Sequence, residues 1–354
     1  MEKKKNSFKF ILGTSIIILL IALYLIYSNA PQKEIRAVVL RPQNCSDCFN
    51  IAPILNEVRS SNVNLTIVQY FDVPSAEAEI YLDKYNITKL PAILLFGGTS
   101  NLQSFGEKRN DALVFTRQKP VYLDLQSGKF VGRVNATIIN TPLCSICQNL
   151  SNIVAALRQQ GMSVYENKIN DIEAMRLIGL YNISKLPVLI LSPDALQYEL
   201  MDSWRAQGTI ESDGSFVLRN ITVPYWSVSE KKVKGSVNSI LIKDATCANC
   251  YDPTTHQEVL QNQQSINLKI VSTKILDISS AEGKILISKY KITSVPTIIL
   301  QGDLSVYPTF LNIWPQIGTQ EADGSYIFRN NYLLEGQYYR DLKTNQTLVG
   351  TGKV

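Results

Sequence analysis

Short apolar runs and amphipathic stretches alternate along the chain in an order that occurs three times. Each time, an apolar run of the kind found in buried strands ends at a pair of cysteines; the three runs are IRAVVL, NATII and NSILI. Apolar positions then recur at helical spacing, as at Cys48, Ile51, Leu55 and Val58. A second strand, a second amphipathic helix and an apolar strand opened by proline follow. Each copy therefore predicts an α/β unit of βαβαβ order, with β-hairpins after it.

The spacing of the copies predicts the domain organisation. The pairs begin at Cys45, Cys144 and Cys247, which are 99 and then 103 residues apart. In each copy a tyrosine stands six residues before the proline, in KYNITKLP, LYNISKLP and KYKITSVP, and the later segments NDALVFTR, SDGSFVLR and ADGSYIFR align without a gap. We predict three tandem domains at 33–132, 133–235 and 236–354. No linker rich in Gly and Ser separates them, so we expect short connections.

The N-terminal region contains a candidate membrane anchor. Residues 1–10 are rich in lysine, and residues 11–27 carry no charge and approach the length that a helix needs to cross a bilayer. Basic residues before the span predict a cytoplasmic tail at 1–10, a transmembrane helix at 11–27 and all three domains on the extracytoplasmic side of the cell membrane. The alternative is a cleaved signal peptide, because Ser28 and Ala30 form a small-x-small pattern. Pro31 would directly follow that cleavage site, and this favours the uncleaved anchor.

Composition excludes two classes of protein. The chain has 354 residues, of which 45% are hydrophobic and 18% charged, so it can form folded cores and is not a disordered chain. Its net charge of +5 lies partly in the N-terminal tail. A broad basic surface is therefore not indicated, and we expect no nucleic-acid partner.

A CxxC pair at a strand-to-helix junction, with a proline about forty residues later opening an apolar strand, resembles the thioredoxin fold. The stretch CSDCFNIAPILNEV is especially similar to the active-site helix of that family, and includes Pro53 five residues after the second cysteine. The resemblance implies cis bonds before three prolines that would contact substrate, namely Pro91, Pro187 and Pro296. It also implies redox-active pairs, namely Cys45 and Cys48, Cys144 and Cys147, and Cys247 and Cys250.

The chain also departs from the thioredoxin pattern. No tryptophan precedes any of the CxxC pairs, and the position of the buried acid behind the cysteines holds Val39, Ile138 or Leu241. The last third of each copy reads as hairpins, with Asp-Gly turns in the second and third copies, and the final helix of the family is not evident. Efficient reduction in the manner of thioredoxin is therefore not implied.

The cysteine pairs have three interpretations. A four-cysteine zinc site commonly needs two pairs separated by fifteen to twenty residues, whereas here about a hundred separate them. His256, the only histidine, could add one further ligand to the third pair, but it reads as a polar helix residue. A structural disulfide that closes four residues contributes only about 2 kcal/mol through chain entropy. The redox interpretation expects the attacking cysteine at a helix N-terminus, where backbone N–H groups and the helix dipole favour its thiolate. Cys45 or Cys144 would attack a disulfide, and Cys48 or Cys147, one helical turn on, would resolve the mixed intermediate.

The three pairs are not expected to be equivalent. Asp47 lies inside the first pair, and its charge opposes a neighbouring thiolate, so that site should be more reducing than one with histidine there. The second pair encloses the uncharged Ser145 and Ile146. In the third copy Asp252-Pro253 resembles a helix start located after Cys250. The attacking cysteine would then lie in a loop, away from the favourable electrostatic field at the N-terminus of the helix. The third site should be the least similar to thioredoxin.

The sequence supports two functional hypotheses. The first is a membrane-anchored thiol-disulfide oxidoreductase or isomerase that acts on exported proteins with thiols or disulfides, or relays electrons to a membrane redox partner. The second is a binding or assembly module without enzymatic activity, in which the CxxC disulfides are structural. Neither hypothesis requires a metal or another cofactor. The reduction potentials of the pairs separate the two, because structural disulfides are much harder to reduce.

Overall fold

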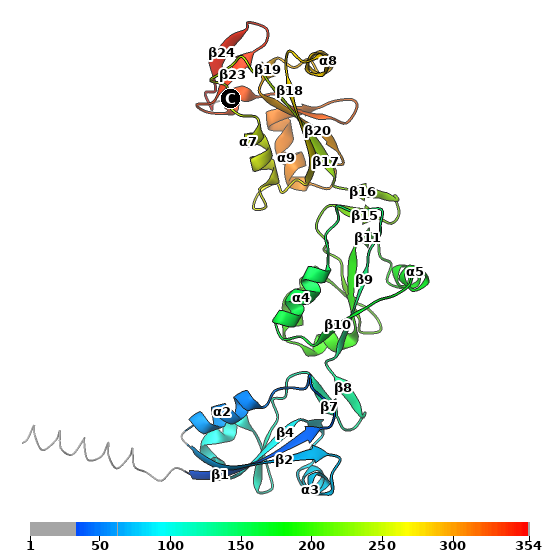
Figure 1. Ribbon diagram of the computed structural model, residues 1–354, viewed down its shortest axis with the longest axis vertical. Coiled ribbons are helices and arrows are strands. Elements are labelled where there is room, and N and C mark those ends of the chain that lie inside the picture. Colours follow the sequence, from blue (N-terminus) through cyan, green and yellow to red (C-terminus); the bar gives the residue numbers. More distant parts are fainter. Residues whose placement is uncertain (1–32, 62, 353–354) are drawn as a thin grey trace, which may run out of the picture. The chain divides into compact units, whose positions relative to one another are not determined.

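The computed structural model describes residues 33–61 and 63–352, and these form two compact units that meet in sequence at Arg133 and Val134 (Figure 1). The predicted transmembrane segment, residues 11–27, lies outside the described residues. Among the helices of 33–61 and 63–352, none combines the length and the apolar character needed to cross a membrane. A mixed sheet with flanking helices occurs three times, and we refer to these as the first, second and third repeats. The domain boundaries predicted from the sequence remain a prediction.

The first repeat is built on a five-stranded sheet of order β2-β1-β4-β6-β5. Strand β1 pairs with β2 in parallel and with β4 in antiparallel orientation. The elements are β1 (Lys33–Pro42), α2 (Ala52–Ser60), β2 (Val63–Val73), α3 (Ala76–Tyr85), β3 (Lys89–Leu90), β4 (Ala92–Gly97), η1 (Thr99–Phe105), β5 (Gly106–Arg109), β6 (Ala112–Phe115), β7 (Tyr122–Asp124) and β8 (Lys129–Val131). The first repeat is therefore the α/β unit with added hairpins that the sequence predicted.

The second and third repeats follow the same plan, with sheets of order β10-β9-β12-β14-β13 and β18-β17-β20-β22-β21. The second repeat contains β9 (Val134–Ile139), α4 (Ser151–Gln159), β10 (Val164–Asn167), α5 (Asp171–Leu180), β11 (Lys185–Leu186), β12 (Val188–Leu191), η2 (Pro193–Gln197), α6 (Leu200–Trp204), η3 (Arg205–Gln207), β13 (Gly208–Ile210), β14 (Phe216–Leu218), β15 (Tyr225–Ser227) and β16 (Lys232–Lys234). The third contains β17 (Val237–Lys243), α7 (Thr254–Gln261), β18 (Ile270–Asp277), α8 (Ala281–Lys289), β19 (Ser294–Val295), β20 (Thr297–Gly302), α9 (Pro308–Ile317), β21 (Gly318–Gln320), β22 (Tyr326–Phe328), η4 (Asn331–Leu333), β23 (Tyr338–Asp341) and β24 (Gln346–Val349). The sequence analysis did not predict α9.

Both faces of each central strand are buried, which explains why the strand before the cysteines is almost continuously apolar. In the first repeat Ala37 and Val39 pack on the side of α2, whereas Val38 and Leu40 pack on the side of α3. Successive side chains of a strand point to opposite faces, so the two helices cover opposite faces of the sheet (Figure 1). The cysteine turn follows directly from this rigid central strand.

The repeated tyrosine has a structural role. Tyr85 donates a hydrogen bond from its hydroxyl to Asp111 at 2.8 Å, and the equivalent pairs are Tyr181 with Asp213 at 2.8 Å and Tyr290 with Asp323 at 2.9 Å. These bonds join the end of the second helix to the turn between the last two strands of the sheet. They account for the conservation of spacing between the two aligned motifs within this chain, and they fix the start of the strand that follows the proline.

The final hairpin of each repeat lies beside the residues that precede the proline. Strands β7 and β8 form a three-stranded sheet with β3, and the orders β11-β15-β16 and β19-β23-β24 repeat this arrangement. The hairpins predicted after the βαβαβ unit are therefore present. Their pairing with β3, β11 and β19 places them next to the cysteine turn. In the first repeat Phe49 N donates a hydrogen bond to Val121 O at 2.7 Å.

Candidate functional site

All six cysteines form disulfides within their own CxxC turn. Cys45 is bonded to Cys48, Cys144 to Cys147 and Cys247 to Cys250, with Cα atoms 5.3 to 5.4 Å apart. This confirms the pairing that the sequence predicted. Each turn connects the central strand of the sheet to the first helix, so the three disulfides occupy equivalent places in the three repeats.

The helices begin later than the sequence analysis placed them. Helices α2, α4 and α7 start at Ala52, Ser151 and Thr254, in every case four residues after the second cysteine. The cause is a repeated turn in which a side-chain oxygen accepts from the first helical N–H. Asn50, Asn149 and Asp252 are the acceptors.

Two expectations are therefore wrong. The cysteines do not occupy the first turn of a helix, where the dipole acts most strongly. The third pair is not distinguished by its helix start either, because Asp252 has direct counterparts in Asn50 and Asn149. The differences between the sites must come from the residues around them.

The three expected prolines are preceded by cis peptide bonds and lie at the cysteine turns. The bonds are Leu90-Pro91, Leu186-Pro187 and Val295-Pro296. Pro91 and Pro187 line the same cavities as the first and second disulfides, and Leu186 O lies 3.9 Å from Cys147 Sγ. The structure therefore brings each of these two predicted substrate-contacting prolines together with its predicted reactive pair.

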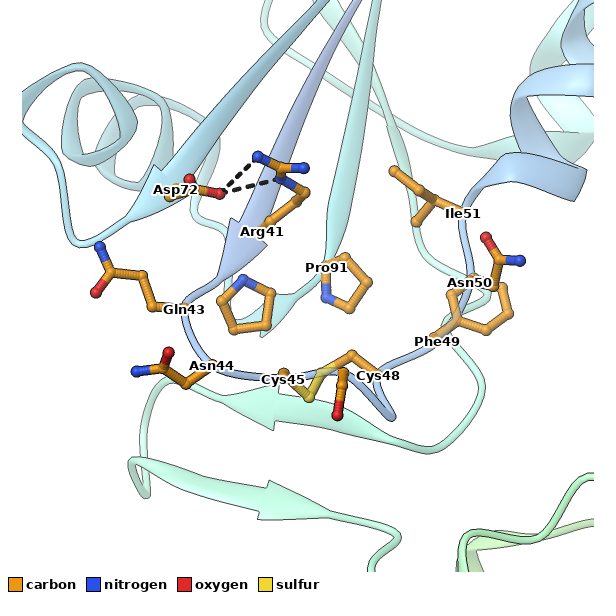
Figure 2. Close-up of a pocket in the computed structure, with 12 residues that line it drawn as sticks. Arg41, Gln43, Asn44, Cys45, Cys48, Phe49, Asn50, Ile51, Asp72 and Pro91 are labelled. Carbon is orange, nitrogen blue, oxygen red and sulfur yellow. Dashed lines mark hydrogen bonds and ion pairs between the residues drawn. A yellow bond between two sulfur atoms is a disulfide. The ribbon is translucent and has the colours of Figure 1, made fainter. Parts of the chain in front are cut away.

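The first disulfide lies on an open cavity of about 760 Å³ (Figure 2). Cys45, Cys48 and Pro91 line it, together with the polar side chains of Gln43 and Asn44. The rim carries Arg41 and Asp72, whose side chains are about half exposed and form an ion pair at 2.9 Å. Both cysteines are partly exposed, so a thiol from another chain can reach the disulfide.

A charged pair that the sequence analysis missed lies next to Cys45. Arg133, two residues after the end of β8, donates from Nε to Asp47 Oδ2 at 2.9 Å and from Nη2 to Asp47 Oδ1 at 2.6 Å. The same Nη2 lies 3.7 Å from Cys45 Sγ, and the guanidinium carbon lies 4.0 Å from the centre of the Phe130 ring. The expectation for Asp47 treated its carboxylate as a lone charge. The structure pairs it with a cation that also contacts the cysteine.

The second site is smaller and without charge between its cysteines. Its cavity of about 380 Å³ is lined by both cysteines, Pro187, Thr141 and Gln148. Cys144 is only 7% exposed, whereas Cys147 is partly exposed. The second site therefore resembles the first in layout but presents less of the first cysteine to solvent.

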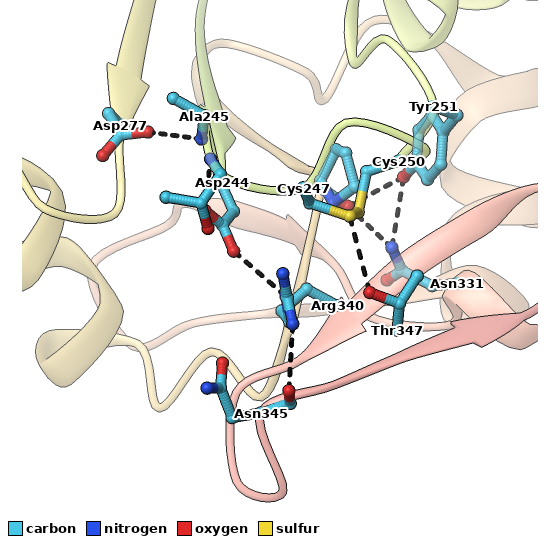
Figure 3. Close-up of a disulfide and its surroundings, with 12 residues drawn as sticks. Asp244, Ala245, Cys247, Cys250, Tyr251, Asp277, Asn331, Arg340, Asn345 and Thr347 are labelled. Carbon is cyan, nitrogen blue, oxygen red and sulfur yellow. Dashed lines mark hydrogen bonds and ion pairs between the residues drawn. A yellow bond between two sulfur atoms is a disulfide. The ribbon is translucent and has the colours of Figure 1, made fainter.

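The third disulfide is covered by the final hairpin (Figure 3). Cys247 is 9% exposed, and its Sγ lies 3.8 Å from Thr347 Oγ1 on β24. Tyr251 N donates to Tyr338 O on β23 at 3.0 Å, and Cys250 forms a β-bridge with the same residue. The hairpin is thus joined to both ends of the CxxC turn.

A buried ion pair holds the third turn from the other side. The side chain of Asp244 is only 3% exposed and pairs with Arg340 Nε on β23 at 3.1 Å. Its other oxygen accepts from the backbone and the hydroxyl of Thr246, at 2.8 and 2.6 Å. The sequence analysis looked for a buried acid at Leu241 and missed Asp244, which stands three residues before Cys247.

A polar network centred on Tyr251 lies behind the third disulfide. The Tyr251 hydroxyl donates to Pro296 O at 2.7 Å and lies 2.7 Å from His256 Nε2, and Asn331 donates to both the hydroxyl and Pro296 O, at 3.2 and 2.7 Å. Burial raises the pKa of Tyr251 and lowers the pKa of His256 to about 4. His256 packs on Phe328 with ring centres 4.4 Å apart.

The described residues contain no cluster of three or more His, Cys, Asp or Glu side chains placed to hold a metal.

Comparisons with known proteins found matches only among solved structures. No protein-family model matches the chain, and no curated protein matches it. A crystal structure of ERdj5 (form II) matches with 11% identity over 81% of this chain, which spans 41% of that chain, at a TM-score of 0.15. The NTD_N/C domain of the alkylhydroperoxide reductase AhpF from Enterococcus faecalis matches with 10% identity over 78% of this chain and 86% of that chain, and human ERp44 with 12% over 75% and 77%, both at a TM-score of 0.15.

Proposed function

We propose that this chain is a membrane-anchored, exported thiol-disulfide oxidoreductase that reacts with other proteins at its first and second CxxC pairs. One observation carries the proposal: the Cys45–Cys48 disulfide and Pro91 line the same open cavity, with both cysteines partly exposed. A reactive disulfide needs access for a second thiol. The backbone beside Pro91 offers that partner chain a surface next to the sulfur atoms.

The reaction is an exchange of one disulfide for another. A thiolate of the partner protein attacks Cys45 Sγ, the bond to Cys48 breaks, and Cys48 leaves as the thiolate. A second thiolate of the partner protein then attacks the partner sulfur that is bonded to Cys45, and Cys45 leaves as the thiolate. The partner gains a disulfide, and the CxxC pair gains two electrons. In the opposite direction, reduced Cys45 attacks a partner disulfide and Cys48 resolves the mixed intermediate. The same roles are assigned to Cys144 and Cys147.

The location of the reaction is part of the proposal. The apolar, uncharged residues 11–27 support a single membrane span, and the lysines before it support a cytoplasmic N-terminus. All three disulfides would then lie on the side where disulfides persist. The partners would be exported proteins with thiols or disulfides, and a membrane redox partner that restores the CxxC pairs.

A membrane-impermeant maleimide should label the mildly reduced cysteines in intact cells. Labelling only after lysis would contradict this orientation.

For the third pair we propose the alternative role, a structural disulfide. Cys247 is nearly buried, as Cys144 is, but the third turn is also tied to side chains of the final hairpin, namely Thr347 and Arg340. An attacking thiolate must approach a sulfur atom directly, so the hairpin would have to open first. The third pair would therefore stabilise its repeat and leave exchange to the other two.

Trapping of mixed disulfides tests the proposed function. In Cys48→Ser the resolving thiol is absent, so covalent complexes between Cys45 and client proteins should accumulate on non-reducing gels. Cys45→Ser should trap none through the first site, and the matched variant Cys250→Ser should trap none through the third. Equal trapping by Cys48→Ser and Cys45→Ser would contradict the assignment of attacking and resolving cysteines. Absence of complexes with Cys48→Ser and with Cys147→Ser would contradict exchange altogether.

A further inference from the structure

The charged pair beside the first disulfide has a geometry suited to control Cys45. Arg133 binds Asp47 with two nitrogens and packs over Phe130, which leaves Nη2 at 3.7 Å from Cys45 Sγ. Asp47 Oδ1 lies 3.5 Å from the same sulfur. A cation and an anion therefore both lie next to the sulfur atom that would carry the negative charge of a thiolate.

The side chains of this pair are partly shielded from water. That of Asp47 is 18% exposed and that of Arg133 is 37% exposed, so charge effects are screened less than between fully solvated groups. The charged groups that line the cavity of Cys45 are Arg41 and Asp72, which are paired with each other and more exposed. The helix that follows starts at Ala52 and carries no acidic residue in its first turn. Asp47 and Arg133 both lie within 4 Å of Cys45 Sγ, at 3.5 and 3.7 Å.

We propose that Arg133 is a positioning residue that stabilises the Cys45 thiolate and offsets the opposing charge of Asp47. In the absence of Arg133, the negative charge of Asp47 would disfavour a thiolate at Cys45. With the guanidinium bound to Asp47, the new negative charge meets a neutral pair whose nearest donor points at the sulfur. The inference rests on the proposed function for its biological meaning, but it concerns a property of Cys45 that a small reagent can measure.

No equivalent cation stands at the same place in the second repeat, where GKFVGRV is replaced by KKVKGSV and Ser236 occupies the position of Arg133. The second pair also encloses no carboxylate. Arginine and aspartate thus occur together in the first repeat and are both replaced in the second. Cys144 is therefore an internal reference within the same molecule.

The test measures the pH dependence of alkylation of Cys45 by iodoacetamide in the reduced full chain, read by peptide mass spectrometry in a Cys48→Ser background. Arg133→Gln should lower the alkylation rate at pH 7 by about tenfold, since it removes the cation that contacts both Asp47 and the sulfur. Asp47→Asn should raise the rate several-fold, because it removes the negative charge beside the sulfur and keeps the guanidinium. The double variant should lie between the two. The rate at Cys144 should stay constant in all of them.

An unchanged pH profile in Arg133→Gln would overturn the proposal. So would a change of the same sign in Arg133→Gln and Asp47→Asn, which would indicate a loss of local structure. Arg133→Lys serves as the conservative variant, since it keeps the charge. The fall in the logarithm of the Cys45 alkylation rate should be less than half of the fall in Arg133→Gln. An equal fall in both variants would contradict an electrostatic role. Failure of the trapping experiment with these effects intact would refute the proposed function and leave the role of Arg133 standing.

Discussion

The first and third CxxC turns have the same backbone plan and different surroundings. In both, a disulfide lies between the central strand and the first helix, a side chain two residues later starts that helix, and a cis bond precedes the nearby proline. In the first repeat the disulfide lines an open cavity and a cation reaches Cys45. In the third the equivalent sulfur contacts Thr347, and Asp244, Tyr251 and Arg340 tie the turn to its neighbours.

This difference shows that the motif alone does not determine the chemistry. The scaffold places a CxxC disulfide in each repeat, and the side chains around the disulfide differ from one repeat to the next. Near Cys45 the final hairpin is followed by Arg133, and near Cys247 it contributes Arg340 and Thr347. We therefore expect exchange at the first site and stabilisation at the third. The following predictions test that contrast from the largest expected effect to the smallest.

The largest difference in stability should come from the two ion pairs near the disulfides. Asp244→Asn removes one partner of a buried pair and should cost the third repeat about 3 to 5 kcal/mol, because Arg340 is left without its counter-charge. Asp72→Asn breaks the exposed pair with Arg41 and should cost the first repeat less than about 1 kcal/mol. Hydrogen exchange of peptides from β17 and β1 measures the two effects separately. Similar costs in both repeats would show that the third turn is no more tightly held than the first.

Acid should destabilise the third repeat before the other two. Burial lowers the pKa of His256 to about 4, below its ordinary value of 6.5. The unfolded chain then binds a proton that the folded chain does not, so stability is complete above pH 6.5 and is lost as the pH falls towards 4, by at most about 3 kcal/mol. Urea unfolding followed by limited proteolysis and mass spectrometry reports each repeat. His256 is the only histidine of the chain, so His256→Gln should abolish this step, and an equal loss in the first repeat would contradict its assignment.

The smallest effect concerns the hydroxyl at the centre of the third site. Tyr251→Phe removes the shared partner of His256, Asn331 and Pro296 O and should cost about 1 to 3 kcal/mol, since these groups stay buried. It should also speed reduction of the third disulfide. The control is Tyr338→Phe, whose side chain is 47% exposed and which should change stability by less than about 0.5 kcal/mol. An equal effect of both substitutions would show that the buried network does not hold the turn.

The features that the sequence predicted correctly are local or repeated. The cysteine pairing follows from residues three apart in a turn, and the strands before each pair are apolar because both faces are buried. The cis bonds before Pro91, Pro187 and Pro296 followed from the family resemblance. The three copies made each of these patterns more specific than one copy would have been.

The features that were missed depend on tertiary contacts. Arg133 is 86 residues from Asp47 and Arg340 is 96 residues from Asp244, and no periodicity links such positions. One signal was available, because alignment of the repeats shows that Arg133 replaces a serine after the final hairpin. The helix starts were misplaced because Asn50 and Asn149 are less recognisable as helix-start signals than Asp252-Pro253. Helix α9 was missed because Pro315 lies inside it and proline normally ends a helix.

The most direct test is a redox titration of the three disulfides in the same molecule. The full chain is equilibrated with a series of glutathione buffers, the free thiols are alkylated, and each CxxC peptide is quantified by mass spectrometry. We predict that the reduction potential of Cys45–Cys48 lies within the range of exchange catalysts, at about −120 to −230 mV. The reduction potential of Cys247–Cys250 should lie below about −300 mV, so this pair should stay oxidised in the buffers that reduce the first. Reduction of the third pair at the same potential as the first, or before it, would contradict the division between an exchanging and a structural disulfide.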